Sequence, residues 1–165
     1  MMNKIFLMLS LFLSLYMNSQ KENKNKIDLK QGNTILDSYI KNQIAKEKPK
    51  PVEYKSARKI MFYDFDSDGD KDLYAFFTLE GFGGGNNWQH YIAIFEIENN
   101  LVKAVDDTVL YGDSLKEYNN GEFLKFSNGY VYFRLYGYDW KTQEKFIKTI
   151  GFTLYQKKIV TDKKY

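Results

Sequence analysis

The residues best suited to chemistry in this chain are five aspartates that fall at every second position of one short stretch. They are Asp64, Asp66, Asp68, Asp70 and Asp72. Carboxylates this close repel one another unless a cation lies among them, and Ca²⁺ prefers about six to eight oxygen ligands. Gly69 lies inside the run, and glycine permits the sharp turn that brings later ligands back toward the first. The spacing therefore predicts a Ca²⁺ site.

The order of the acids also predicts how each would bind the ion. The seventh position of such a loop commonly contributes its backbone carbonyl, so Asp70 is expected to bind through the main chain and the other four aspartates through their side chains. An EF-hand is excluded, because it requires a bidentate Glu at the twelfth position, where Ala75 stands. The apolar residues on both sides of the loop also favour strands over helices.

Other cations fit the loop less well. Zinc would require His or Cys, and neither is nearby. Magnesium prefers fewer carboxylates and more water. The alternative without any ion is a solvated acidic turn, since turns favour Asp and Gly. For Ca²⁺ we expect the weak affinity of extracellular modules, roughly 10⁻⁴ to 10⁻³ M, and a structural role.

Residues 59–78 resemble the calcium loops of the FG-GAP/VCBS repeat families, whose pattern is D-x-D-x-D-G-x-x-D-L. Here the pattern is matched by Asp64, Asp66, Asp68, Gly69, Asp72 and Leu73. The resemblance implies a Ca²⁺-bound strand–loop–strand hairpin in which Leu73 begins the outgoing strand. Those families stack several repeats, and this chain has one copy, so their adhesion role is not implied.

The elements expected around the loop are one helix and then strands. Apolar residues spaced for one face predict a helix over residues 33–48, which Asn33 or Thr34 would cap. From Val52 onward, alternating apolar residues and short turns predict about seven strands. We expect a turn at Asn99-Asn100, an interruption or bulge at Asp106-Asp107 and a hairpin turn at Asn128-Gly129. The fold class expected is α+β, an N-terminal helix packed on a mainly antiparallel sheet of about seven strands. A small β-sandwich or barrel is the alternative.

The N-terminus predicts export. Lys4 precedes a mostly apolar run over residues 5–16, and Ser19 is a small residue at a cut site. We expect a signal peptide over residues 1–19, a flexible mature N-terminus over 20–32 and a single α+β domain over 33–165. The run is too short for a bilayer span, so no stable membrane span is expected after signal cleavage, and an uncleaved anchor is the alternative. The chain has no Cys, so a metal could take over the role of a disulfide.

Composition and the remaining polar residues limit the function classes. The net charge of +3 is small and dispersed, which argues against nucleic acid. The glycine-rich segment at residues 81–85 lacks the Lys-Ser/Thr of a phosphate loop, and the single histidine, His90, is expected to be structural. Two-carboxylate hydrolysis would need a pair among the glutamates, and the sequence pairs none of them: Glu80, Glu117, Glu122 and Glu144.

Aromatic residues in expected loops are candidates for contact with a partner. Trp88, Tyr138 and Trp140 could stack on sugars or anchor a protein, or they could cap the core. The function expected is therefore an exported, non-enzymatic, Ca²⁺-stabilised domain that binds a protein or glycan ligand in the periplasm or outside the cell, such as an inhibitor or immunity-type protein. The alternative is a glycan-binding module or a carbohydrate-active hydrolase.

Overall fold

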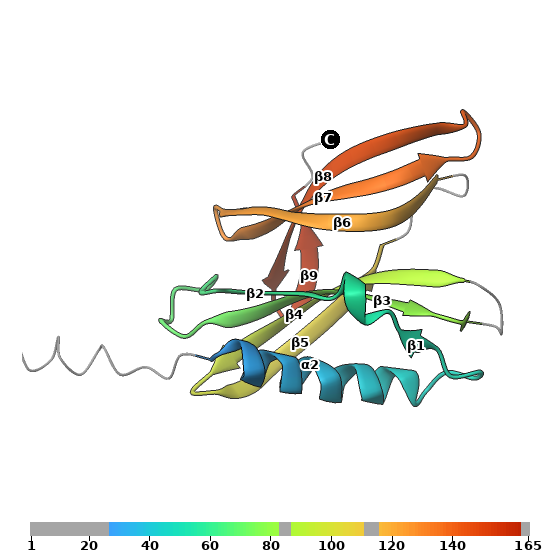
Figure 1. Ribbon diagram of the computed structural model, residues 1–165. Helices are drawn as coiled ribbons and strands as arrows, with labels where there is room; N and C mark the ends of the chain where they lie inside the picture. The colour runs from blue at the N-terminus through green and yellow to red at the C-terminus, as the bar shows by residue number, and fades with distance from the viewer. Residues whose placement is uncertain (1–26, 83–86, 111–115, 163–165) are drawn as a thin grey trace, which may run out of the picture.

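The structure is a computed structural model that describes residues 27–82, 87–110 and 116–162. Within these ranges the chain forms one α-helix and nine antiparallel strands in two sheets (Figure 1). The helix is α2 (Leu29–Ile44), and a 3₁₀ turn, η2, covers Lys55–Ala57. The first sheet contains β1 (Val52–Glu53), β2 (Lys59–Tyr63), β3 (Asp72–Glu80), β4 (Trp88–Glu98) and β5 (Leu101–Val109). The second contains β6 (Lys116–Ser127), β7 (Tyr130–Asp139), β8 (Glu144–Tyr155) and β9 (Lys158–Thr161).

The expectation of one sheet of about seven strands is wrong, and the class is β-rich with a single described helix. Strand β6 pairs with β7 and not with β5, so the chain starts a second sheet there. The expected loop over residues 112–120 is also corrected in part, because Lys116 to Asn120 pair with β7 as the first part of β6. Residues 111–115 lie outside the described residues.

Strand β3 is the centre of the molecule because both of its faces are buried. Alternate side chains, from Leu73 to Leu79, pack against α2 in one apolar cluster. The intervening side chains of Tyr74 and Phe76 pack against the second sheet in another. Because side chains alternate between faces of a strand, a continuous apolar run fits a strand covered on both sides. The layers are therefore the helix, the first sheet and the second sheet (Figure 1).

Helix α2 begins earlier than the sequence predicted. Asp28 is the N-cap, and its carboxylate accepts a hydrogen bond from the Gln31 backbone N–H at 2.7 Å while the Gln31 side chain accepts from the Asp28 N–H. This reciprocal capping box satisfies two backbone donors that a helix end leaves free, so the start at Asn33 or Thr34 is corrected. Gly32 lies buried against Phe62, where an added Cβ would come within 2.7 Å of the ring.

The turns follow the sequence more closely. Asn99, Asn100, Asn128 and Gly129 all have positive φ, as tight hairpin turns require. The expected bulge at Asp106-Asp107 is wrong: both residues pair regularly with β4, and the register of that pair of strands shifts between Glu96 and Ile97. Asp106 instead reaches the second sheet, where it accepts a hydrogen bond from the Ile159 N–H at 2.8 Å.

The expected signal peptide over residues 1–19 lies outside the described residues. In the part of the chain that the structure describes, no helix is long and apolar enough to cross a bilayer.

Candidate metal site

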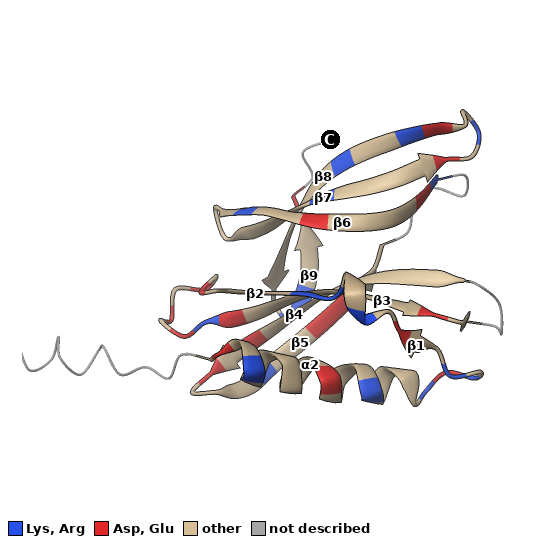
Figure 2. Ribbon diagram, viewed as in Figure 1, with Lys and Arg blue, Asp and Glu red and all other residues tan. Residues whose placement is uncertain are grey.

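Three of the five aspartates converge in the loop between β2 and β3. One carboxylate oxygen from each of Asp64, Asp66 and Asp72 lies within 4.8 Å of the other two. Figure 2 shows Asp and Glu gathered in this loop, whereas the Lys and Arg residues in view are spread over the helix and both sheets. The arrangement places three anionic oxygens around one point, as a hard cation requires.

Asp68 and Asp70 lie outside this triad and have other contacts. Asp68 Oδ1 accepts a hydrogen bond from the Asp70 N–H at 2.8 Å. Asp70 is buried, and its Oδ2 accepts from the Asn99 N–H at 2.6 Å in the turn between β4 and β5. The carboxylate of Asp70 is therefore used to join two hairpins.

The loop wraps because its carboxylates accept hydrogen bonds from its own backbone. Asp64 Oδ2 accepts from the Gly69 N–H at 2.9 Å, and Asp66 Oδ1 accepts from the Asp68 N–H at 3.2 Å. Gly69 has a φ of 93°, in the left-handed region that glycine adopts without strain. These bonds turn the chain so that Asp64 and Asp72 meet.

Asp72 is the most buried member of the triad, with 1% of its surface exposed. Its Oδ1 accepts from the Ile97 N–H at 2.9 Å, and its Oδ2 accepts from the Phe65 N–H at 3.3 Å. It therefore connects the loop to the end of β4, where the register of the strands shifts.

The surroundings of Asp66 and Asp72 disfavour the charged forms of their carboxylates. Burial raises the pKa of Asp72 to about 7, against the lowering effect of the hydrogen bonds from Ile97 and Phe65. Burial also raises the pKa of Asp66, and the negative charges of Asp68, Asp64 and Glu96 add to that effect. A cation among these oxygens would oppose both causes.

One carboxylate oxygen in the triad has no hydrogen-bond partner. Asp64 Oδ1 is buried and makes no hydrogen bond among the described residues, although the other oxygen of the same carboxylate bonds to Gly69. A buried polar atom without a partner costs about 1–3 kcal/mol, and more when it is charged. Three carboxylates, one of which has a buried oxygen without a partner, fit a hard divalent cation.

The other candidate residues do not form a second site with this loop. His90 is buried, and its Nδ1 lies 2.8 Å from the Thr78 hydroxyl. Trp88 packs against Tyr54, whereas Trp140 packs against Tyr138 and donates a hydrogen bond to Glu117. These aromatic residues occupy the end of the sheets remote from the acidic loop (Figure 1).

The acidic residues outside the loop are mostly engaged elsewhere. Glu122 forms an ion pair with Arg134 and accepts a hydrogen bond from Tyr136. Gly83, Gly84 and Gly85 lie outside the described residues, so the expected glycine-rich connection stays a prediction.

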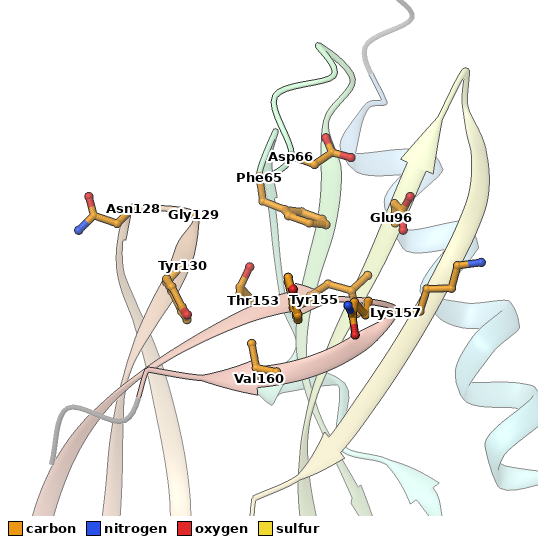
Figure 3. Close-up of a pocket in the computed structure, with 12 residues that line it drawn as sticks. Phe65, Asp66, Glu96, Asn128, Gly129, Tyr130, Thr153, Tyr155, Lys157 and Val160 are labelled. Atoms are coloured by element: carbon orange, nitrogen blue, oxygen red, sulfur yellow. The ribbon is translucent and has the colours of Figure 1, made fainter.

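A groove beside the acidic loop was not predicted from the sequence. It has a volume of about 680 Å³ and is lined by Phe65 and Asp66 of the loop, by Glu96 of β4, and by residues of the two hairpin tips of the second sheet (Figure 3). The sequence could not bring these segments together, because doing so requires knowing that the two sheets face one another. The sequence features that mark the two hairpin tips are the turn residues Asn128-Gly129 and Gln156-Lys157, all of which have positive φ.

Comparison with protein-family models, with curated proteins and with solved structures found no match to this chain. The likeness to FG-GAP/VCBS loops therefore stays a prediction from residues 59–78.

Proposed function

We propose that the loop between β2 and β3 binds one Ca²⁺ and that the chain is an exported, non-enzymatic binding domain stabilised by that ion. The observation that carries the proposal is the buried Oδ1 of Asp64, which has no hydrogen-bond partner among the described residues and belongs to a carboxylate beside those of Asp66 and Asp72. Carboxylate oxygens are the ligands that Ca²⁺ prefers.

The contacts around the triad favour a structural role for the ion. Asp72 bonds to the Ile97 N–H and Asp70 bonds to the Asn99 N–H, so the loop is already joined to the end of β4 and to the next turn. An ion held by the triad would fix Asp72 in the charged form that accepts both of its backbone hydrogen bonds. The ion would thereby cross-link the loop and β4, and because the chain has no Cys, no disulfide can supply such a cross-link.

The described residues favour binding over catalysis. His90 is buried and bonded to Thr78, so it is not placed to exchange protons with a substrate. The groove beside the loop has two acids in its lining, Asp66 and Glu96, and Asp66 belongs to the triad. A hydrolase would need two carboxylates with separate roles across a pocket.

Titration of the full mature chain with CaCl₂ in a calorimeter tests the proposal. We expect one site per chain with a dissociation constant of roughly 10⁻⁴ to 10⁻³ M, and weaker binding of Mg²⁺. Asp64→Asn should abolish the heat of Ca²⁺ binding, whereas Glu47→Gln makes the same change of charge at an exposed position three residues beyond α2 and should leave it unchanged. Absence of both heat and any melting shift at millimolar Ca²⁺ would refute the proposal.

A further inference from the structure

The groove beside the acidic loop is formed by four segments that are far apart in the sequence. One side is made by Phe65, Asp66 and Glu96, and the other by the turn at residues 128–130. Residues 153–157, at the end of β8 and in the turn that follows, lie between them (Figure 3). Because Asp66 belongs both to the triad and to the groove lining, a cation held by the triad would lie at the edge of this groove.

The lining offers polar groups that are not used within the molecule. The side chains of Asn128, Tyr155 and Gln156 make no hydrogen bond, ion pair or ring contact with another described residue. Tyr155 is 63% exposed, so its ring is open to solvent at this groove. These side chains are exposed, so their donors, their acceptors and one aromatic face are open to an external ligand in a single groove.

The size and charge of the groove indicate the kind of ligand. A volume of about 680 Å³ falls within the range of small-molecule sites and is too small for a protein surface. With Ca²⁺ bound to Asp66, the remaining charges of the lining are those of Glu96 and Lys157, which are opposite in sign. The aliphatic lining consists of Leu154, which is buried, and Val160. A neutral polar ligand fits these groups better than an anion, a lipid or an apolar peptide.

We propose that this groove binds a neutral oligosaccharide. The rings of Tyr130 and Tyr155 provide aromatic faces against which the C–H bonds of a sugar can pack, and the amides of Asn128 and Gln156 provide donors and acceptors for its hydroxyl groups. Ca²⁺ takes six to eight oxygens, and the triad with Asp68 and the Asp70 carbonyl would supply five, so the ion has at least one position left for a hydroxyl oxygen at the edge of the groove. This last contact rests on the proposed function, whereas packing on the tyrosines does not.

The test uses the full mature chain and soluble cello-, malto-, manno- and chito-oligosaccharides, titrated at up to 10 mM with 5 mM CaCl₂ and followed by calorimetry and by NMR. We expect at least one series to bind. Tyr155→Ala should weaken that binding at least tenfold while leaving the Ca²⁺ affinity unchanged. Trp140→Ala is the matched control, since Trp140 is 54% exposed but lies in the distant turn between β7 and β8, and it should leave sugar binding unchanged.

The outcomes separate this proposal from the proposed function. Normal Ca²⁺ binding with no response to any of the four series would overturn the groove proposal and leave the Ca²⁺ site standing. Sugar binding that Tyr155→Ala does not weaken would place the sugar elsewhere and also overturn it. Sugar binding that is lost in Tyr155→Ala but survives EGTA supports the groove and overturns the contact with Ca²⁺.

Discussion

Asp64→Asn should stabilise the protein without Ca²⁺ and remove its response to Ca²⁺. In EGTA the carboxylates of Asp64 and Asp66 repel each other, and the buried Oδ1 of Asp64 has no hydrogen-bond partner among the described residues. An asparagine can keep the hydrogen bond from the Gly69 N–H through its oxygen while its NH₂ group donates to the neighbouring carboxylates. The substitution thus replaces a repulsive contact with a favourable one, at nearly constant shape.

The size of the effect follows from the separation of the charges. Two unit charges 4.8 Å apart repel by about 0.9 kcal/mol in bulk water and by about 3.5 kcal/mol at an effective dielectric constant of about 20. Asp66 is exposed, so the lower part of this range applies, and we expect a gain of about 1–2 kcal/mol. For a chain of this length that is a rise in melting temperature of about 2–8 °C.

Calcium should stabilise the wild type but not the variant. With a dissociation constant of roughly 10⁻⁴ to 10⁻³ M, 10 mM Ca²⁺ stabilises the folded state by about 1.4–2.7 kcal/mol. Thermal melts of both proteins, in EGTA and in 10 mM CaCl₂, measure the two effects, with Glu47→Gln as the control for net charge. A variant that melts below the wild type in EGTA, or that gains as much from Ca²⁺ as the wild type does, would refute the reasoning.

Three further predictions concern the fold. Gly32→Ala should lower the free energy of unfolding, measured in urea, by about 1–3 kcal/mol, because the added Cβ would meet Phe62 at 2.7 Å. Ser38→Ala, on the exposed side of the same helix, should stay within about 0.5 kcal/mol of wild type. Equal effects of the two substitutions would contradict this packing. Asp106→Ala leaves the Ile159 N–H without its acceptor and should lower the free energy of unfolding by about 1–3 kcal/mol. Asp106→Asn keeps an acceptor and should lower it by less. The reverse order would show that the charge of Asp106 matters more than this hydrogen bond. Burial lowers the pKa of His90, against the raising effects of the Tyr118 backbone and Glu117. The unfolded chain therefore takes up the proton first, and stability falls as pH drops below about 6.5. His90→Gln should lose this part of the pH dependence, and an equal change in unfolding free energy from pH 7 to 5 for both proteins, measured in urea, would contradict the prediction.

The sequence predicted the local features whose causes are local. The turns at Asn99-Asn100 and Asn128-Gly129 followed from residues that tolerate positive φ. The convergence of Asp64, Asp66 and Asp72 agrees with the spacing and the glycine of the loop, while metal binding itself stays a prediction. The helix start was missed because Asp28 and Gln31 form a capping box that the apolar pattern does not reveal.

The features that depend on strand partners could not be predicted. Alternating apolar residues show which side of a strand is buried, but they do not show which strand lies beside it. The hairpin of β6 and β7 around Asn128-Gly129 was predicted, but its extension to Lys116 and the contact of Asp106 with β9 were not. The groove is a consequence of that same arrangement, since its lining comes from both sheets.

The double burial of β3 has a consequence for the chain before it folds. Residues 73–79 form a run of seven with no charge and no proline, the composition of segments that pair between chains and aggregate. Charged residues border this run on both sides, with Asp70, Lys71 and Asp72 before it and Glu80 after it. Such flanking charges oppose intermolecular pairing while the run is exposed. We therefore expect the aspartates to protect β3 from aggregation in the unfolded chain, in which they are spread apart and ionised, and to need a cation only once folding has brought them together.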